Sequence, residues 1–457
     1  MSTTLLEALT NLLGERVSTA AAVLDQHGKD ESHHTPAPPD IVVFPESSEE
    51  VAAIVRLCAD ARTPVIPFGA GTSLEGGIGA LQGGVCLDMT GMNRIIQVNA
   101  DDLDVTVEAG VTRKQLNADL RDTGLFFPID PGADATIGGM TSTRASGTNA
   151  VRYGTMRENV LNVKAVLADG RIIQTGGRAR KSAAGYDLTR MFVGAEGTLG
   201  VITEVTVRLF GVPEAISAAV CSFPSVENAV RCCMLTIQSG VPVARVELLD
   251  ATQMRACIQY SNLDCEPVPT LFFEFHGSQA NVEEQANTIQ DIASEFGGGD
   301  FQWTGQTEDR NKLWQARHDA LYAALALKPG AKAWSTDVCL PISRLADCIE
   351  ETRFDIAASS LLATMVGHVG DGNFHVIFLL DPERPQDFVE AQRINDRMVS
   401  RAIAMEGTCT GEHGVGIGKR HCLEQEFGDA LDIMRDLKRT LDPLNVMNPG
   451  KIFAQVP

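Results

Sequence analysis

Two histidines stand at the ends of a sharp turn in the stretch GHVGDGNFH, residues 367–375. Apolar runs on both sides of a Gly-Asp-Gly-Asn turn are the pattern of a β-hairpin. If residues 370–373 form the loop, His368 pairs with His375. Both rings then lie on one face, with Cβ atoms roughly 5 Å apart. This spacing suits two ligands of a single metal ion.

The best candidate for a third ligand lies in the glycine-rich stretch CTGEHGVG, residues 409–416, which carries Glu412 and His413. Two imidazoles and a carboxylate with one open position form a catalytic metal pattern. A histidine in a strand is more often a structural residue than a ligand. The pairing across the turn, together with a second Glu-His site among glycines, favours the metal interpretation.

The composition describes a soluble globular protein of several domains. The chain has 457 residues, 44% of them hydrophobic, which is enough for substantial cores. With 38 basic against 59 acidic residues its net charge is -21. Such a charge repels phosphate backbones and anionic membranes, so we expect no nucleic-acid partner.

The cysteines and the N-terminus indicate the compartment. Eleven scattered cysteines without a Cys-x-x-Cys motif argue against a zinc ribbon or an iron–sulfur cluster and suit a reducing environment. The first 17 residues form a helical apolar stripe without a basic start, which is not a signal peptide. No apolar run approaches the ~20 residues of a membrane span. These features predict a cytoplasmic protein, or one bound peripherally at the inner membrane.

The elements expected in the first 210 residues form an α+β domain. Strands are predicted at residues 41–44, 65–68, 85–89, 95–98 and 105–108, a hairpin around Asp169-Gly170, and a strand at 201–209. A capping box at residues 47–50 begins a helix. The order of these elements is not a regular βαβ repeat, so the fold is not of the Rossmann type.

Longer helices alternate with strands after residue 210, and the glycine-rich texture returns after Gly407. We therefore expect domains at 1–210 and 211–408, followed by a C-terminal helical segment at 409–457 that returns to the first domain. Residues 308–327 are predicted to form one helix with Trp314, Arg317 and Leu321 on one face.

Three glycine-rich loops, at residues 69–77, 132–147 and 194–200, are too many for one phosphate and suit an extended cofactor. Backbone N–H groups freed by glycine can bind a pyrophosphate without net positive charge. The alternative is that these loops are simple turns.

The first of these loops, PFGAGTSLEG at 67–76, resembles the FAD pyrophosphate loop of the vanillyl-alcohol-oxidase-type flavoproteins. The residues Thr136-Ile137-Gly138-Gly139 and Tyr153-Gly154 are similar to that family's second flavin segment. The hairpin 368–375, Glu412-His413-Gly414, and the stretches 333–338 and 448–451 resemble FAD-linked D-2-hydroxyacid dehydrogenases. Within these, the cytochrome-type D-lactate dehydrogenases and the glycolate oxidase FAD subunit are the most similar groups.

The resemblance implies a PCMH-type (VAO-like) FAD-binding domain followed by an α+β substrate or cap domain. It also implies the cofactor-binding residues Pro67, Gly69, Ala70, Gly71, Thr72, Ser73, Leu74, Pro131, Gly132, Thr136, Gly138, Gly139, Thr143, Ser146, Glu196, Gly200, Ile202 and Asn448. The implied reaction is oxidation of a small D-2-hydroxy acid to the 2-keto acid, with hydride transfer to the flavin. Electrons would pass to a cytochrome, a quinone or an electron-transfer flavoprotein, not to NAD.

The resemblance also implies roles for individual residues. His368, His375 and Glu412 would hold a divalent metal, zinc or manganese, that polarises the substrate hydroxyl, and His413 would be the general base. Arg317 is expected to bind the substrate carboxylate, assisted by Lys332, because a guanidinium matches a carboxylate bidentately.

The substrate is expected to be D-lactate or a similar short acid. Ile377 stands where the D-2-hydroxyglutarate branch carries an asparagine, so a second carboxylate would lack a partner. Glycolate and D-2-hydroxyglutarate remain alternatives within the family. Other classes left open are a metallohydrolase, a non-catalytic electron-transfer flavoprotein and a phenol-oxidising relative without a metal. A homodimer is compatible with these features.

Overall fold

A computed structural model describes residues 3–262 and 265–454. The chain divides into two compact units, each made of chain segments that are separated in the sequence. The first unit holds residues 1–146, 154–212 and 412–457, and the second holds 147–153 and 213–411. From the sequence we placed the domain limits at 210 and 408. The short segment 147–153, expected in the first domain, is part of the second unit.

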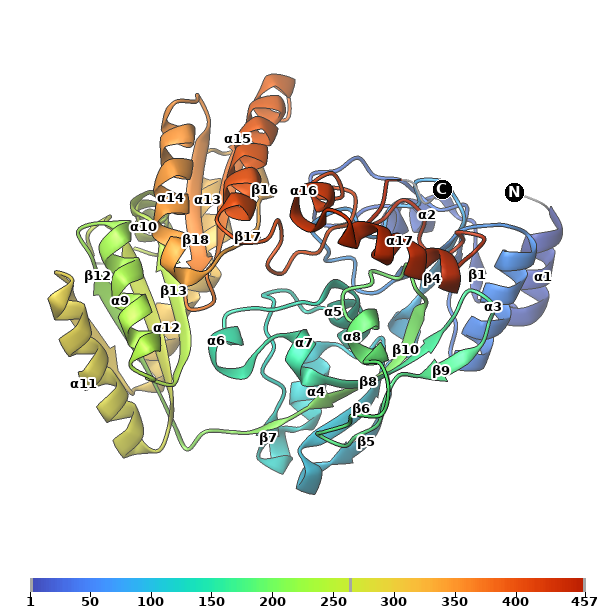
Figure 1. Cartoon of the computed structure of the whole chain (residues 1–457), viewed down its shortest axis with the longest axis horizontal. Helices are drawn as coiled ribbons and strands as arrows, with labels where there is room; N and C mark the ends of the chain where they lie inside the picture. The colour runs from blue at the N-terminus through green and yellow to red at the C-terminus, as the bar shows by residue number, and fades with distance from the viewer. Residues whose placement is uncertain (1–2, 263–264, 455–457) are drawn as a thin grey trace. The chain divides into compact units, whose positions relative to one another are not determined.

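The first unit contains two main sheets (Figure 1). The four-stranded sheet has the order β1-β2-β4-β3, in which β2, β4 and β3 run parallel. The five-stranded antiparallel sheet has the order β5-β6-β10-β8-β9. Its strands and those of the first sheet are β1 Val17–Ser18, β2 Ile41–Val43, β3 Val65–Phe68, β4 Val85–Asp88, β5 Ile95–Asn99, β6 Asp104–Glu108, β8 Val160–Val166, β9 Ile172–Gln174 and β10 Val201–Arg208; a short pair, β7 Leu125–Phe126 and β11 Phe210–Gly211, lies apart.

Short helices and long loops connect these strands. The N-cap of α3 is Ser47, whose side chain accepts a hydrogen bond from the Glu50 N–H, so the predicted capping signal marks a real helix start. The stretch after Pro131, expected to be a loop, contains a helix at its centre because Thr136 caps it by accepting from the Gly139 N–H. The helices of this unit are α1 Thr3–Leu13, α2 Ala21–His27, α3 Ser48–Asp60, α4 Arg113–Asp119, α5 Ile137–Thr143, α7 Met156–Asn159, α8 Leu188–Phe192, α16 Leu423–Phe427 and α17 Ala430–Leu441.

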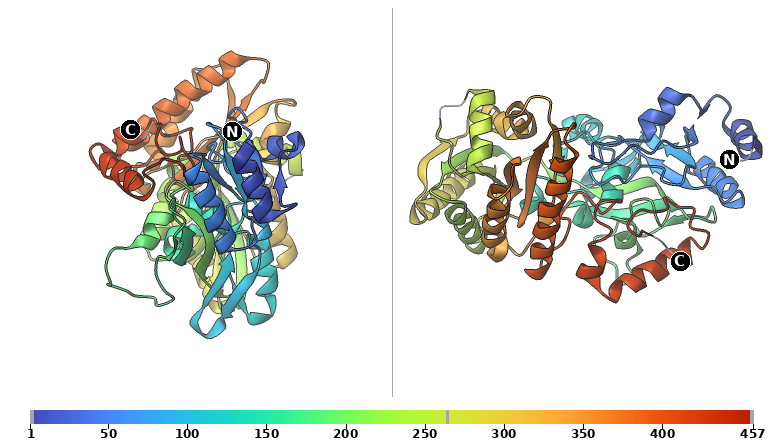
Figure 2. Two further views of the ribbon diagram at one scale, coloured as in Figure 1. Left: turned by 90° about the vertical axis from the view of Figure 1, so that its right-hand side faces the viewer. Right: turned by 90° about the horizontal axis from the view of Figure 1, so that it is seen from above.

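The second unit is built on one antiparallel sheet of eight strands, ordered β15-β12-β14-β13-β18-β19-β16, with β17 also paired to β19. Helices α9, α11, α14 and α15 pack together on one side, and α10, α12 and α13 pack together on the other (Figures 1 and 2). The strands are β12 Ala215–Ser222, β13 Val243–Leu249, β14 Thr270–Gly277, β15 Gly299–Thr304, β16 Lys332–Ser335, β17 Val338–Cys339, β18 Leu362–His368 and β19 Asn373–Leu380; the helices are α6 Ala150–Tyr153, α9 Val226–Gln238, α10 Ala251–Ser261, α11 Gln279–Glu295, α12 Thr307–His318, α13 Ala320–Ala326, α14 Ile342–Ala357 and α15 Pro385–Ala404.

The architecture confirms the expected α+β class. Among the described residues, none of the helices combines the length and the hydropathy that a membrane-spanning segment needs. The central strands β18 and β19 are buried almost throughout, so the apolar runs around the two histidines belong to the middle of a sheet.

The C-terminal segment is fixed to the first unit by a buried lysine. The Lys438 ammonium forms an ion pair with Asp442 and donates to the carbonyl oxygens of Thr198 and Met447, each at 2.8 Å. Asp442 in turn accepts from the backbone N–H groups of Val446 and Met447. Lys438 is 1% exposed, so all of its charge is compensated inside the protein.

We predict that Lys438→Met destabilises the protein by about 3–5 kcal/mol, because it leaves Asp442 buried without its cation. Chemical denaturation of the purified protein measures this loss. The control is Arg439→Met on the same helix, where the side chain is 45% exposed and its ion pair with Asp436 contributes little. Equal stabilities of the two variants would contradict the structural role of Lys438.

Candidate active site

A cavity in the first unit is lined by residues of the glycine-rich loops predicted from the sequence. Every residue expected to bind the cofactor lines it except Gly132. The lining residues are Pro67, Phe68, Gly69, Ala70, Gly71, Thr72, Ser73, Leu74, Gly77, Ile78, Met89, Ala109, Pro131, Ala133, Ala135, Thr136, Gly138, Gly139, Met140, Ser142, Thr143, Ala145, Ser146, Glu196, Gly197, Gly200, Ile202, Glu412, His413 and Asn448.

The chemistry of this lining fits a dinucleotide such as FAD. Its residues are mostly apolar side chains, glycines and small hydroxyl-bearing side chains, with Glu196, Glu412, His413 and Asn448 as the other polar groups, and no lysine or arginine occurs among them. Backbone N–H groups and hydroxyls must therefore bind any phosphate there, as in an anion-binding nest. Gly71 has φ +71°, a conformation that side chains rarely adopt, and a Cβ atom there would lie 3.0 Å from the ring of Phe68.

Glu196 connects this cavity to the loop that carries Glu412 and His413. Its two carboxylate oxygens accept the backbone N–H groups of Val415 and Gly416, at 2.7 and 2.8 Å. The Glu196 carbonyl accepts from the Asn448 side chain at 2.7 Å. Burial raises the pKa of Glu196, against the opposing effect of the two N–H donors. Glu196, expected to contact the cofactor, thus also holds the 412–416 loop in the cavity wall.

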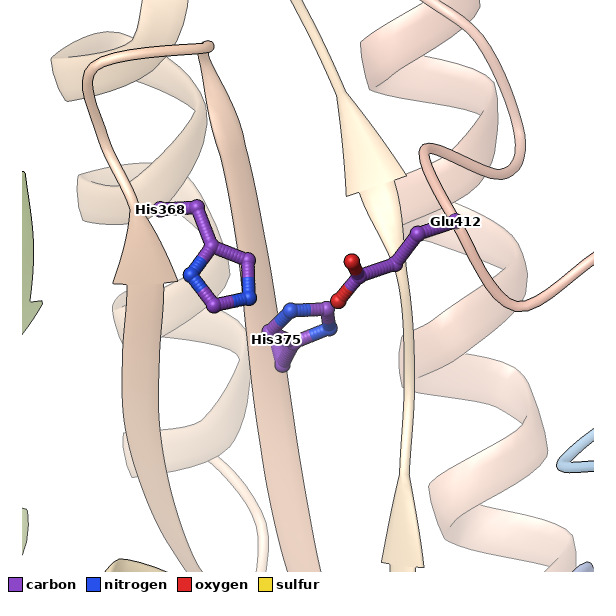
Figure 3. Close-up of side chains that lie close together, drawn as sticks. All are labelled: His368, His375 and Glu412. Carbon is purple, nitrogen blue, oxygen red and sulfur yellow. The ribbon is translucent and has the colours of Figure 1, made fainter. Parts of the chain in front are cut away.

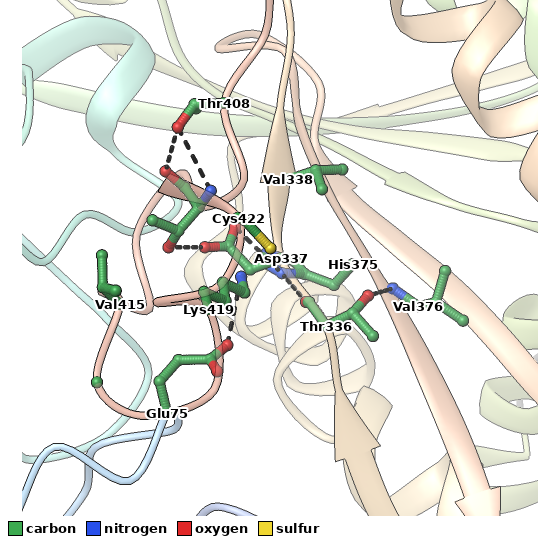
Figure 4. Close-up of polar contacts among 12 residues, drawn as sticks. Glu75, Thr336, Asp337, Val338, His375, Val376, Thr408, Val415, Lys419 and Cys422 are labelled. Atoms are coloured by element: carbon green, nitrogen blue, oxygen red, sulfur yellow. Dashed lines mark hydrogen bonds and ion pairs between the residues drawn. The ribbon is translucent and has the colours of Figure 1, made fainter. Parts of the chain in front are cut away.

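Glu75 also contacts the segment that follows Glu412 and His413. The backbone carbonyl of Glu75 accepts the Ile417 N–H at 2.8 Å, and its carboxylate lies 3.3 Å from the Lys419 ammonium (Figure 4). Gly416 has φ +47°, and a Cβ atom there would lie 2.0 Å from the Glu75 carbonyl oxygen. No side chain fits at this position, which accounts for a glycine at 416.

The hairpin of the second unit differs in register from the sequence prediction. Strands β18 and β19 pair Val366 with His375, Gly367 with Phe374 and His368 with Asn373, so the predicted His368–His375 pairing is wrong. The loop is residues 369–372, one position earlier than expected. The two histidines are diagonal neighbours on one face, and their ring centroids lie 5.3 Å apart. The rings still meet because a shift of two residues preserves the face of a strand.

Hydrogen bonds fix which nitrogen each ring presents. The Nδ1–H of His375 donates to the Thr336 carbonyl at 2.8 Å, so its Nε2 lone pair faces away from the backbone (Figure 4). The Nδ1 of His368 lies 2.6 Å from the Glu247 carboxylate and donates to it. Each ring would therefore bind a metal ion through Nε2.

The segment after α15, which leads to Glu412, is tied to the hairpin through Asp337, the residue before β17. Asp337 accepts from the Asn373 amide at 2.6 Å and from the Thr410 hydroxyl at 2.7 Å, and this ties residues 408–411 to the hairpin. A Cβ atom on Gly411 would lie 2.3 Å from the Asn373 amide nitrogen, so this approach needs glycine. Glu412 follows directly in the chain.

Figure 3 shows the side chains of His368, His375 and Glu412 pointing toward one another. Each offers a ligand atom, and these atoms all lie within 4.8 Å of one another. Two ligands of one zinc ion are at most about 4.2 Å apart, which is two bonds of ~2.1 Å. Two imidazoles and a carboxylate are donor types that fit one divalent ion.

The helix expected at residues 308–327 is two helices. Helix α12 ends at His318 and α13 begins at Ala320, with Asp319 between them at φ -78° and ψ 3°. As a result Trp314 is buried whereas Leu321 is 41% exposed, so the predicted common face is wrong. Arg317, in the last turn of α12, donates to the Glu247 carboxylate through Nε at 2.9 Å and Nη2 at 2.5 Å.

Glu247 is the residue that the sequence reasoning missed. It is fully buried in the apolar strand β13 and lies between Arg317 and His368. A carboxylate inside a run of valines and leucines was the available signal, since such a group is almost never buried unless paired.

Lys332 is not brought to the histidines. It pairs with Leu380 at the end of β16, five residues along β19 from His375, and its side chain is exposed. At about 3.4 Å per residue this is a backbone separation of ~17 Å. The expected assistance of Lys332 at the substrate carboxylate therefore has no support in this geometry.

Comparison with known proteins agrees with these two units. Residues 39–176 match a family described as an FAD binding domain, and residues 212–452 match the C-terminal domain of FAD linked oxidases. The chain belongs to the FAD-linked oxidase family. The expected FAD dependence and oxidoreductase class are thereby confirmed.

Several curated relatives are similar over nearly the whole chain. The "Probable D-lactate dehydrogenase, mitochondrial" of Danio rerio is 56% identical over 96% of this chain and 89% of its own. The "D-lactate dehydrogenase [cytochrome], mitochondrial" of Arabidopsis thaliana is 47% identical, covering 98% and 80%. The "Glycolate oxidase subunit GlcD" of Bacillus subtilis is 34% identical, covering 91% and 89%.

Solved structures show the fold. That of p-cresol methylhydroxylase matches with a TM-score of 0.82 and 18% identity, covering 98% of this chain and 96% of that one. Alkyldihydroxyacetonephosphate synthase matches with a TM-score of 0.78 and 19% identity, covering 98% and 86%. The expected PCMH-type (VAO-like) fold is confirmed.

The expected localisation is wrong. The relatives from Danio rerio, Arabidopsis thaliana and Saccharomyces cerevisiae are all described as mitochondrial, which contradicts the cytoplasmic assignment drawn from cysteine usage and the N-terminal pattern. Cysteine usage separates oxidising from reducing surroundings but does not distinguish the reducing compartments from one another.

We predict that Gly71→Val yields protein with little or no bound FAD, because valine strains a backbone at positive φ and its side chain meets Phe68. The visible flavin absorbance per purified protein measures occupancy. The matched control is Gly177→Val, where φ is not positive and a Cβ atom has open space. Full flavin occupancy in the Gly71 variant would remove this loop from the cofactor site.

Proposed function

We propose that this protein is an FAD-dependent dehydrogenase that oxidises D-lactate, or a similar short D-2-hydroxy acid, to the 2-keto acid. The observation that carries the proposal is that four relatives, 42–56% identical over 96–99% of this chain, are all described as D-lactate dehydrogenases. When bound, FAD would accept the hydride from the substrate's Cα.

The surroundings of the histidines support a short substrate. Val366 is paired with His375 across the hairpin, and Ile377 lies two residues further on the same face. Both are buried in an apolar cluster that includes Trp314. These neighbours offer no hydrogen bond to a second carboxylate, which would be costly to bury without a partner.

We assign the activation and deprotonation of the substrate hydroxyl to the three residues of Figure 3 and to His413, the residue after Glu412. A divalent ion, zinc or manganese, held by His368, His375 and Glu412 would supply Lewis acidity toward the substrate hydroxyl. His413, which lines the flavin cavity beside Glu412, is our candidate for the base that takes the hydroxyl proton.

Arg317 remains our candidate for binding the substrate carboxylate. Its Nε and Nη2 groups donate to one oxygen of Glu247, and a substrate carboxylate would bind through Nη1. A guanidinium has five N–H donors in one plane and can hydrogen-bond two carboxylates at once. The ammonium of a lysine at the same place would lack this planar donor arrangement.

The electron acceptor that we favour is a cytochrome, because the Arabidopsis thaliana and Saccharomyces cerevisiae relatives carry that word in their descriptions. A quinone or an electron-transfer flavoprotein is the alternative. A homodimer stays a prediction. Glycolate is the second candidate substrate, supported by the Bacillus subtilis relative.

Anaerobic addition of D-lactate is predicted to bleach the flavin rapidly, with L-lactate much slower and D-2-hydroxyglutarate a poorer substrate by kcat/KM. Stopped-flow absorbance with this panel, including glycolate, makes the measurement. Dithionite bleaches any flavoprotein and is the positive control. Equal rates for the two lactate enantiomers, or preference for D-2-hydroxyglutarate, would contradict the proposal. An electron-transfer flavoprotein or a metallohydrolase would show no bleaching by any acid of the panel.

Removal of the metal is predicted to lower kcat/KM by at least ~10²-fold while the flavin stays bound. The variant His375→Ala should show the same loss together with less than one equivalent of metal by elemental analysis. The control His421→Ala changes an exposed histidine outside the cluster and should keep both metal and activity. Full activity in a chelated, metal-free enzyme would return the hairpin histidines to a structural role.

A further inference from the structure

A buried carboxylate connects two groups of the proposed site, and no step assigned above uses it. Glu247 is fully buried, and its two oxygens have different partners. Oε1 accepts from His368 Nδ1 at 2.6 Å, and Oε2 accepts from Arg317 at 2.5 and 2.9 Å.

The sheet register determines this contact. Strand β13 pairs with β18 so that Leu248 stands opposite Gly367 and Leu249 opposite Val366. The same register places Glu247 opposite His368, on the same face of the sheet. The contact therefore follows from backbone pairing and does not depend on a flexible side chain reaching across a gap.

The charges of this group are balanced. Glu247 is fully buried, and both of its oxygens lie within hydrogen-bonding distance of a donor, Oε1 of the His368 imidazole and Oε2 of the Arg317 guanidinium. An ionised carboxylate with no solvent contact needs a cation, and Arg317 supplies it. With its Nδ1–H directed at Glu247, His368 would bind a metal ion through Nε2.

We propose that Glu247 is a positioning residue, which fixes the tautomer and the orientation of His368 for metal binding and whose charge Arg317 compensates. The inference rests on the metal site proposed above. His375 obtains the same tautomer from the Thr336 carbonyl, a neutral acceptor. The Glu247 carboxylate also joins the proposed metal ligand His368 to the candidate carboxylate-binding Arg317 through a single side chain.

The test is the metal affinity of Glu247→Gln in the FAD-loaded protein. An amide keeps the size of the side chain but loses the charge, so we expect zinc to bind about 10–100-fold more weakly, with unchanged flavin content. Titration of zinc against a chromophoric chelator measures this affinity without reference to activity.

The matched control is Glu274→Gln in the neighbouring strand β14. Glu274 is also buried, and it pairs with Arg245 and His276. This variant loses an equivalent buried charge, so it should cost similar stability and leave the zinc affinity unchanged. Equal losses of zinc affinity in both variants would show a merely structural effect and overturn the inference.

A double variant separates positioning from electrostatic repulsion. Removing Glu247 leaves a buried arginine charge that could itself repel the metal. If positioning is the cause, Glu247→Gln combined with Arg317→Met keeps the weakened zinc affinity. If the arginine charge is the cause, the double variant regains wild-type affinity and the inference fails.

Where Glu247→Gln does not fold, two further measurements decide the question. Glu247→Asp shortens the side chain and should weaken zinc binding in the same direction. In the zinc-loaded wild type, ¹⁵N spectra of labelled histidine should show His368 protonated at Nδ1 and coordinated at Nε2. Coordination through Nδ1 would overturn the inference alone, whereas a wild-type protein that binds no zinc would overturn the metal site as well.

Discussion

The two N–H groups of Val415 and Gly416 meet the carboxylate of Glu196, and the arrangement of the proposed site depends on this contact. The chain has left the first unit for about 200 residues before it returns at Glu412. A buried carboxylate is expensive to leave without donors, so the contact favours one position of the returning loop. That position places His413 in the wall of the flavin cavity.

In the second unit, a β-sheet positions the residues of the proposed site. Antiparallel pairing of β13, β18 and β19 puts Glu247 and both histidines on one face, where α12 supplies Arg317. Since a strand presents alternate residues to alternate faces, Glu247 and the two histidines are placed by the backbone hydrogen bonds of the sheet. Rigid placement of this kind is what a metal site requires, because ligand spacing must hold within a few tenths of an ångström.

The net charge of the chain is -21, but the local charge at these sites does not follow it. The buried Lys438 and the partly buried Arg317 each face a carboxylate, Asp442 and Glu247, which compensates their charges locally. The flavin cavity contains neither residue type in its lining and offers backbone N–H groups and hydroxyls instead. An acidic chain can therefore hold an anionic dinucleotide, because the local donors and not the overall charge determine binding.

The amino-acid sequence by itself determined the strands, the flavin loops and the presence of a histidine hairpin, because these features are encoded in short-range patterns of glycine, apolar alternation and turn residues. The sequence did not predict the strand register, the break in the helix or the contacts between residues far apart in the chain. The register of the hairpin differs from the predicted one by two residues, and the helix predicted at 308–327 is interrupted at Asp319. The role of Glu247 was not predicted. Glu247 acquires its meaning only when β13 pairs with β18 and brings it opposite His368, 121 positions away in the chain. The tertiary structure decides such contacts, because the energy of a buried charge depends on its neighbours in space and not on its neighbours in sequence.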